Sequence, residues 1–124
     1  MIGIDCYLSI SVNEAWLLVQ NISNGVQIPI DIRPVDFFAT EHIDTQSSAE
    51  TTRWFGETLF TKLLPVTFFK VFFSGKDVVL YSQNGEESAR FAQVLVDHQF
   101  SETVYNLVGG IDAWKAAGLP TISG

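Results

Sequence analysis

Short blocks of apolar residues alternate with polar segments along the chain, and the spacing of the apolar positions changes from block to block. Four apolar runs have the length of strands, and they lie at residues 7–10, 28–32, 78–81 and 103–107. Four other segments repeat apolar residues at helical spacing, and they lie at residues 11–22, 34–39, 86–97 and 111–117. Strands that alternate with helices indicate an α/β domain with a mainly parallel central sheet flanked by helices.

Local signals support several of these boundaries. Ser11 opens the first helix, with Glu14 as its capping-box partner. Asn24 and Gly25 end that helix, because both residues tolerate the left-handed backbone of a helix C-terminus. Pro29 is awkward inside its strand, since a proline cannot donate to a sheet ladder. We therefore expect Pro29 near the start of the strand or at an edge of the sheet.

The segment before the third apolar run is the least regular part of the chain. We expect two short helices here, one running through Arg53, Phe55 and Leu59, the other covering residues 66–73 and stopping at Gly75. Lysines and a proline interrupt the apolar residues of this segment. It therefore falls short of the roughly 20 apolar residues that a membrane span needs, and we predict no membrane span.

Composition and charge narrow the class of protein. The chain has 124 residues, of which 47% are hydrophobic, and 7 Lys and Arg against 14 Asp and Glu give a net charge of −7. This length suits one domain, residues 1–124, and the hydrophobic fraction excludes a disordered chain. The acidic balance argues against a nucleic acid or an anionic membrane as partner, because both would repel the chain.

The cysteine content bears on the compartment. Cys6 is the single cysteine and cannot form an internal disulfide, which fits a reducing environment. The first residues carry no Lys or Arg ahead of the apolar ones, unlike a secretory signal, so we expect a cytoplasmic protein. We interpret Cys6 as a small apolar residue and Trp16, Trp54 and Trp114 as packing residues rather than ligand platforms.

The loop after the strand at residues 78–81 is the candidate functional segment. Its residues are Ser82, Gln83, Asn84, Gly85, Glu86, Glu87 and Ser88. Ligands of parallel α/β sheets bind beyond the carboxyl ends of the strands, which is where this loop lies. The backbone N–H groups of such a loop, with the dipole of the following helix, can hold an oxyanion or lower the pKa of a cysteine.

The side chains of this loop do not suit that chemistry. A hydroxyl such as that of Ser82 needs a nearby base to become a nucleophile. His98 lies about 15 Å or more from the loop, at about 1.5 Å per helical residue, and we interpret it as a solvated helix end. We expect His42 to make a structural hydrogen bond. Glu86 and Glu87 stabilise the helix N-terminus, but they also repel sulfate, thiosulfate or phosphate.

The C-terminal half contains two long motifs, D-V-V-L-Y-S-Q-N-G-E-E-S and V-Y-N-L-V-G-G-I-D-A-W-K-A-A-G-L-P. In these motifs it resembles a rhodanese domain. The ending that is typical of the family, a glycine pair, an apolar residue, alanine-tryptophan and a closing A-G-L-P, is complete at residues 109–120. With the weaker agreement of the N-terminal half, the resemblance spans nearly the whole chain and implies the rhodanese fold.

The N-terminal half agrees at two short motifs. I-D-I-R, which ends at Arg33, resembles the D-x-R strand end of the family, and E-H-I, which begins at Glu41, resembles its G-H-I. We expect Asp31 and Arg33 to form structural hydrogen bonds beneath the loop. Glu41 and Thr45 stand where the family tends to have glycine, which puts the shape of this loop in question.

The family's loop usually reads C-R-x-G-x-R-S, and its cysteine carries a sulfur atom as a persulfide to a thiol or cyanide. The resemblance places Ser82 at the cysteine, Gln83 where an arginine is common and Glu87 at the second arginine, while Gly85 and Ser88 are kept. Serine cannot form a persulfide. Glu87 also inverts the charge that would help to bind an anionic sulfur donor.

These departures predict a non-catalytic rhodanese-like module, a pseudoenzyme with a binding or regulatory role that uses no cofactor and no metal. The first alternative is a sulfurtransferase that acts through Cys6 or through a persulfide supplied in trans. The second is a phosphatase-like anion binder, whose longer loop would need an arginine at Ser88. The third is a serine hydrolase centred on Ser82.

An aromatic segment offers a candidate contact surface. Its apolar residues are Phe60, Leu63, Leu64, Phe68, Phe69, Phe72 and Phe73. Two short helices can bury only part of this set against one sheet face, and the remainder would form an exposed patch. We expect a protein partner or a second copy to dock near residues 68–73, with ordinary core packing of these phenylalanines as the alternative.

Overall fold

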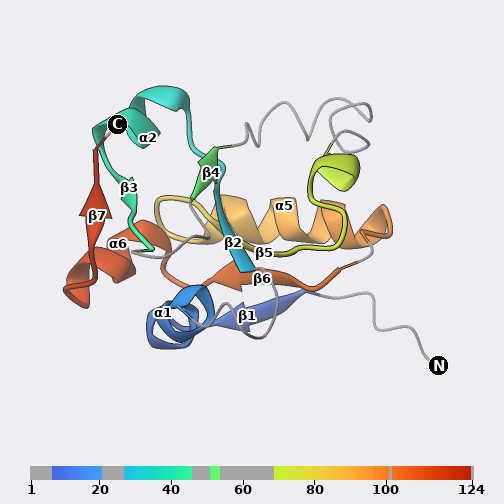
Figure 1. Ribbon diagram of the computed structural model, residues 1–124, viewed down its shortest axis with the longest axis horizontal. Coiled ribbons are helices and arrows are strands. Elements are labelled where there is room, and N and C mark those ends of the chain that lie inside the picture. Colours follow the sequence, from blue (N-terminus) through green and yellow to red (C-terminus); the bar gives the residue numbers. More distant parts are fainter. Residues whose placement is uncertain (1–6, 21–26, 46–50, 54–68, 101, 124) are drawn as a thin grey trace.

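A parallel sheet forms the centre of the molecule (Figure 1). The computed structural model describes residues 7–20, 27–45, 51–53, 69–100 and 102–123. In this part of the chain the sheet has the order β1-β6-β5-β2-β4, and every pairing in it is parallel. Its strands are β1 (Leu8–Ile10), β2 (Gln27–Asp31), β4 (Thr52–Arg53), β5 (Asp77–Tyr81) and β6 (Val104–Leu107). The predicted α/β class with a parallel sheet is confirmed.

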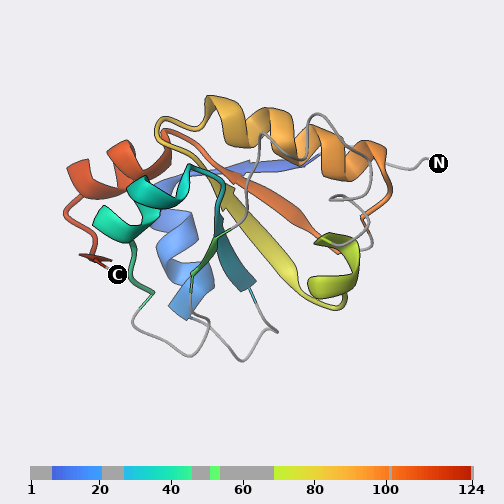
Figure 2. The ribbon, with the colours of Figure 1, turned by 90° about the horizontal axis from the view of Figure 1, so that it is seen from above.

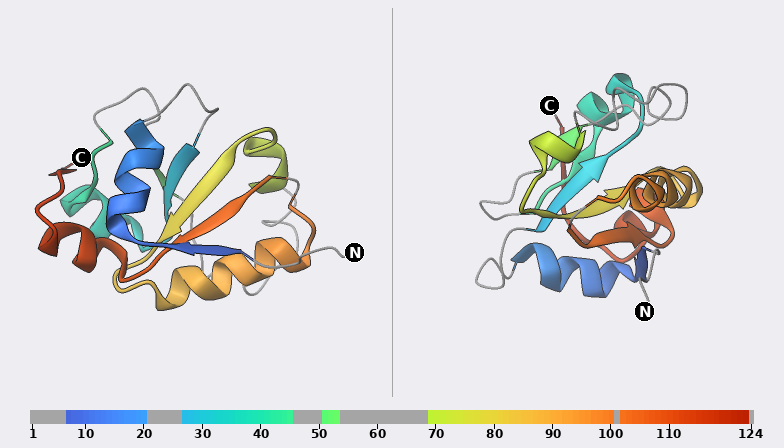
Figure 3. Two further views of the ribbon diagram at one scale, coloured as in Figure 1. Left: turned by 90° about the horizontal axis from the view of Figure 1, so that it is seen from below. Right: turned by 90° about the vertical axis from the view of Figure 1, so that its right-hand side faces the viewer.

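Helices cover both faces of the sheet (Figures 2 and 3). They are α1 (Val12–Gln20), α2 (Val35–Thr40), α5 (Glu86–Asp97) and α6 (Gly110–Ala116). Helix α5 lies on one face and α1 on the other, while α2 and α6 lie toward the carboxyl ends of the strands. A short antiparallel pair, β3 (His42–Ile43) with β7 (Thr121–Ile122), joins the chain after α2 to the C-terminal segment.

The central strand β5 divides the hydrophobic core into two clusters. Its side chains alternate across the sheet, so Val78 and Leu80 pack in the cluster beneath α5, and Val79 and Tyr81 pack in the cluster beneath α1 and α6. All four side chains are buried. Burial on both faces explains why the strand is a continuous apolar run. Because the strand ends at Tyr81, the next residue lies at the carboxyl edge of the sheet.

The helix boundaries follow from local chemistry. The capping box is present: the N–H of Ser11 donates to Glu14 Oε1 at 2.9 Å, and the N–H of Glu14 donates to Ser11 Oγ at 3.2 Å. Helix α5 has the predicted bounds, and its buried residues are Ser88, Phe91, Ala92 and Leu95.

Pro29 is the third residue of the five in β2 rather than its first. On one side it pairs in register with Val79 of β5. On the other side the ladder to β4 includes only Ile30 and Asp31 among the described residues. Within the described part of the chain, Pro29 therefore lies before the stretch of β2 that has neighbours on both sides. At this position the missing N–H of proline costs little.

The prediction of a helix through Arg53 is wrong. Thr52 and Arg53 form β4, which pairs with Ile30 and Asp31 of β2. Sheet pairing with a remote strand overrides the weak local preference for helix, and β-branched Thr52 suits a strand. The predicted continuation through Phe55 and Leu59 lies outside the described residues, as does the expected helix end at Asn24 and Gly25.

Two of the three described residues of the aromatic segment belong to the core. Phe69 and Phe73 are 0% and 5% exposed, so the prediction that they form a contact surface is wrong. Both belong to the cluster beneath α5, where Phe69 packs edge-on against Phe91 with ring centroids 5.4 Å apart. Phe72, three residues after Phe69, is 66% exposed. Phe68, Phe60, Leu63 and Leu64 lie outside the described residues.

No helix within the described ranges has both the length and the apolarity needed to cross a bilayer.

Candidate functional site: the loop between β5 and α5

The loop at residues 82–88 lies at the carboxyl end of β5 and packs against the start of α6. The N–H of Ile111 donates to the carbonyl of Ser82, and the N–H of Asp112 donates to the carbonyl of Gln83, each at 3.0 Å. This approach requires glycine at position 110, where φ is +61° and an added Cβ would lie 2.6 Å from the Gln83 carbonyl oxygen. The glycine pair thus fixes the loop against the neighbouring helix.

Ser82 fills the centre of the loop with its own hydroxyl. It is 3% exposed, and its Oγ accepts the backbone N–H groups of Gly85 at 3.1 Å and Ser88 at 3.3 Å. The hydroxyl proton is donated to Ser88 Oγ at 3.3 Å, and Ser88 Oγ donates in turn to Asn106 Oδ1 at 2.5 Å. The predicted cradle of N–H groups is present, but two of its donors already bind Ser82.

Asn84 and Glu86 stabilise the turn that leads into α5. The N–H of Glu86 donates to Asn84 Oδ1 at 3.1 Å, and Asn84 Nδ2 donates to Glu86 Oε2 at 3.3 Å. Gly85 adopts a left-handed conformation, with φ of 91°, directly before α5. Asn84, Gly85 and Glu86 therefore shape the loop, and their side chains do not line the pocket described below.

Neither histidine forms a hydrogen bond with Ser82 in the described part of the chain. His42 Nδ1 lies 3.0 Å from the carbonyl oxygen of Phe38, on whose ring the imidazole stacks at 3.9 Å between centroids. His98 Nδ1 lies 2.8 Å from the carbonyl oxygen of Val94, at the exposed C-terminal end of α5. Both expectations for the histidines are confirmed, and neither histidine is placed to act as a base for Ser82.

Arg33 lies beside the loop, and its guanidinium forms an ion pair and hydrogen bonds with other protein groups. Its Nη2 lies 2.7 Å from Asp31 Oδ2, and its Nε donates to Asp31 Oδ1 at 3.0 Å. Nη1 donates to Gln83 Oε1 at 3.0 Å, and Nη2 also donates to the carbonyl of Glu41 at 2.6 Å. Burial disfavours the charged guanidinium, but the hydrogen bonds and the charge of Asp31 outweigh it and raise the pKa of Arg33. The expected structural role of this pair is confirmed.

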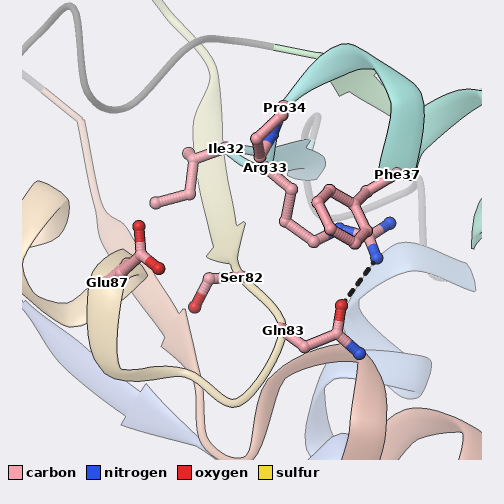
Figure 4. A pocket seen from close by; sticks show the side chains of 7 residues that line it. All are labelled: Ile32, Arg33, Pro34, Phe37, Ser82, Gln83 and Glu87. Carbon is pink, nitrogen blue, oxygen red and sulfur yellow. Dashed lines mark hydrogen bonds between the residues drawn. The ribbon is translucent and has the colours of Figure 1, made fainter.

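A pocket of about 190 Å³ opens between this loop and the end of β2 (Figure 4). It is lined by Ile32, Arg33, Pro34, Phe37, Ser82, Gln83 and Glu87. In Figure 4, Glu87 and Ile32 lie on one side of Ser82, and Arg33 with its hydrogen bond to Gln83 lies on the other. The Glu87 carboxylate is exposed and has no ion pair or hydrogen bond within the described residues.

Three pocket residues were missed by sequence reasoning, namely Ile32, Pro34 and Phe37. The signal that could have found them is the position of I-D-I-R at a strand end. The carboxyl ends of adjacent parallel strands meet at one edge of a sheet, so residues just after β2 had to face the loop after β5.

Other predicted residues have structural roles. Glu41 forms an ion pair with Lys115 at 2.8 Å and accepts the hydroxyl of Thr121, and these contacts lower the pKa of Glu41. Trp114 is fully buried, and its Nε1 donates to the carbonyl of Pro120 at 2.8 Å. Trp16 packs edge-on against it, with ring centroids 5.8 Å apart. Cys6 and Trp54 lie outside the described residues, within which no group of His, Cys, Asp and Glu side chains is suited to a metal ion.

Comparison with known proteins agrees with this architecture. The family model described as "Rhodanese-like domain" matches residues 14–117. The thiosulfate sulfurtransferase GlpE of Coxiella burnetii is 31% identical over 112 residues, which cover 89% of each chain.

Solved structures show the same fold at low sequence identity. A rhodanese-related protein from Thermoplasma volcanium is 19% identical with a TM-score of 0.69, over 95% of this chain and 100% of the other. A yeast protein tyrosine phosphatase of the rhodanese family is 14% identical with a TM-score of 0.72, over 92% and 88% of the two chains. On the strength of the family match and of the GlpE relative, the chain belongs to the rhodanese-like domain family.

Proposed function

We propose that this protein is a rhodanese-like domain that does not transfer sulfur and serves as a binding or regulatory module. The observation that carries the proposal is Ser82, the first residue after β5, whose hydroxyl lies at the centre of the loop. By resemblance to the family, this position belongs to the cysteine that carries the persulfide. A persulfide contains a sulfur–sulfur bond, which an alcohol oxygen cannot form.

The charges around the loop support the same proposal. A site that binds the thiosulfate anion needs cationic side chains or N–H groups to hydrogen-bond it. Arg33 already donates to Asp31, Gln83 and the Glu41 carbonyl. Glu87, which has no ion pair among the described residues, adds a negative charge to the pocket wall. An anionic sulfur donor would therefore meet repulsion where a sulfurtransferase needs attraction.

The name of the Coxiella relative supplies the activity to be tested. We expect wild-type protein mixed with thiosulfate and cyanide to form no more thiocyanate than a heat-denatured control. Thiocyanate formation that Ser82→Ala abolishes would overturn the proposal. Formation that Cys6→Ser abolishes would instead establish sulfur transfer by the unusual route.

The phosphatase-like alternative has less support. Its loop would need an arginine near Ser88, and Ser88 is a buried serine that donates to Asn106. Hydrolysis of para-nitrophenyl phosphate by the wild type, lost in Ser82→Ala, would favour it.

Among the described phenylalanines of the aromatic segment, a protein contact is retained for Phe72, because Phe69 and Phe73 are buried. Sedimentation of wild type against Phe72→Lys measures self-association. A wild type that sediments as a monomer at every concentration would exclude a second copy as the partner.

A further inference from the structure

We infer that the pocket beside Ser82 receives a basic side chain, lysine or arginine, from a partner protein. The inference rests on the proposed function, because it assigns a ligand to the loop that sulfur chemistry would otherwise use. It reverses the charge preference that the family resemblance implies.

The charges that line the pocket favour a cation. Arg33 and Asp31 form an ion pair with 8% and 0% of their side chains exposed, so together they present little net charge to the pocket. Glu87 is the one lining residue with a charge that no other described group balances. Asp112, which accepts Gln83 Nε2 at 2.5 Å, adds a second exposed carboxylate beside the loop.

The walls of the pocket suit a long aliphatic stem. Ile32, Pro34 and Phe37 line it, and Phe37 presents 53% of its surface to solvent. Lysine and arginine lay their methylene groups along apolar surface and keep the charged end near water or a carboxylate. The exposed Glu87 carboxylate at the pocket wall matches that arrangement.

The size of the pocket indicates a single side chain. Its volume of about 190 Å³ is below the roughly 300–1,000 Å³ that is usual for sites of small organic ligands. The net charge of −7 also favours a basic partner, since complementary charge speeds association and excludes acidic competitors. The occupant is therefore a basic residue that projects from a protein surface.

The test is an NMR titration of isotope-labelled protein with N-acetyl-lysine N-methylamide. The matched probe is N-acetyl-norleucine N-methylamide, which keeps the aliphatic stem and lacks the ammonium group. We expect the lysine probe to shift amide signals of residues 33–37 and 82–88 and to bind about two- to fivefold more tightly than norleucine, the range for an exposed ion pair. Added salt should reduce this difference.

Two isosteric variants locate the charge. Glu87→Gln should abolish the preference for lysine over norleucine, whereas Glu86→Gln, one residue away and outside the pocket, should leave it unchanged. Phe37→Ser should weaken both probes, because it removes the apolar wall.

The inference is overturned if the lysine probe shifts no signal in these residues, if norleucine binds wild type equally well, or if both glutamate variants behave alike. The probe comparison on wild type decides the question even if a variant fails to fold. Thiocyanate formation is measured separately, so a protein that transfers sulfur refutes the proposed function, while an inactive protein that ignores the lysine probe refutes this inference alone.

Discussion

Two neighbouring segments of this molecule differ in how closely they keep the family pattern. The segment at residues 109–120 has every feature of the family's ending, and it packs through Gly110 and buried Trp114. The loop at residues 82–88, which lies against it, keeps the glycine and the final serine but has Ser82 and Glu87 where the resemblance implies a cysteine and an arginine. The residues that determine backbone shape are kept, and those that determine chemistry differ. A shared fold does not by itself imply a shared activity.

The largest effect is expected from a substitution that disrupts the close backbone contact between the two segments. Gly110→Ala places a Cβ against the carbonyls of Ser82 and Gln83 at a positive φ, so we expect the free energy of unfolding to fall by about 3 kcal/mol or more. Gly118→Ala is the matched control, because Gly118 also has a positive φ but no atom within 4 Å of an added Cβ. It should cost about 1–2 kcal/mol. Urea titration measures both, and equal losses would refute the role of the close approach.

The chemical difference between the two segments can be tested by introducing the family's cysteine and arginine into the loop in two steps. Ser82→Cys alone should give little sulfur transfer, because Glu87 raises the pKa of the new thiol and repels thiosulfate. Ser82→Cys with Glu87→Arg should be at least about tenfold more active, since replacing a like charge by an opposite one shifts a pKa by about 1–3 units.

The control places the arginine at the neighbouring position, as Ser82→Cys with Glu86→Arg, and thiocyanate formation measures all three variants. A fully active Ser82→Cys single variant would show that the Glu87 charge matters little.

A smaller effect is expected from removing the hydroxyl at the centre of the loop. Ser82→Ala leaves the buried N–H groups of Gly85 and Ser88 without their acceptor, so it should cost about 1–3 kcal/mol in thermal or urea unfolding. Ser9→Ala, at an exposed position of β1, should stay within about 0.5 kcal/mol of wild type. An unchanged stability of Ser82→Ala would mean that Ser82 does not hold the loop together.

The smallest effect concerns Glu41, whose contacts with Lys115 and Thr121 lower its pKa. A carboxyl with a lowered pKa in the folded state stabilises the protein above its unfolded pKa, about 4.3 for glutamate, and that contribution is lost as the pH falls through the folded value. Glu41→Gln should therefore cost less than about 1 kcal/mol at neutral pH and nothing at low pH.

Lys115→Gln should lose a similar amount, and the double variant little more. Additive losses would show that the two side chains are not energetically linked.

Sequence reasoning recovered the parts of the fold that local chemistry determines. The bounds of α5 follow from its periodicity and the turn before it, and the start of α1 follows from the reciprocal bonds of Ser11 and Glu14. It failed where remote contacts decide, as at Arg53, whose two-residue strand exists because β2 lies beside it.

The aromatic segment shows the same limit. Phe69 and Phe72 are the same type of residue three positions apart, yet Phe69 is buried against Phe91 of α5 and Phe72 is 66% exposed. Which of the two is buried depends on contacts with a helix that lies later in the chain.

At the site, the motifs predicted the loop and the Asp31–Arg33 pair. They did not predict that Gln83 bridges Arg33 and Asp112, because that contact joins three separate segments.

The Arg33–Gln83–Asp112 bridge has a consequence for linkage between binding and unfolding. Its three members come from the end of β2, the loop after β5 and the start of α6, so the bridge forms only when these remote parts of the chain are assembled. The pocket that Arg33 and Gln83 line is therefore absent from the unfolded chain. A ligand that occupies the pocket therefore binds the folded state alone and raises the midpoint temperature of unfolding by mass action. At a ligand concentration of a hundred times the dissociation constant, the free energy of unfolding rises by about 2.7 kcal/mol.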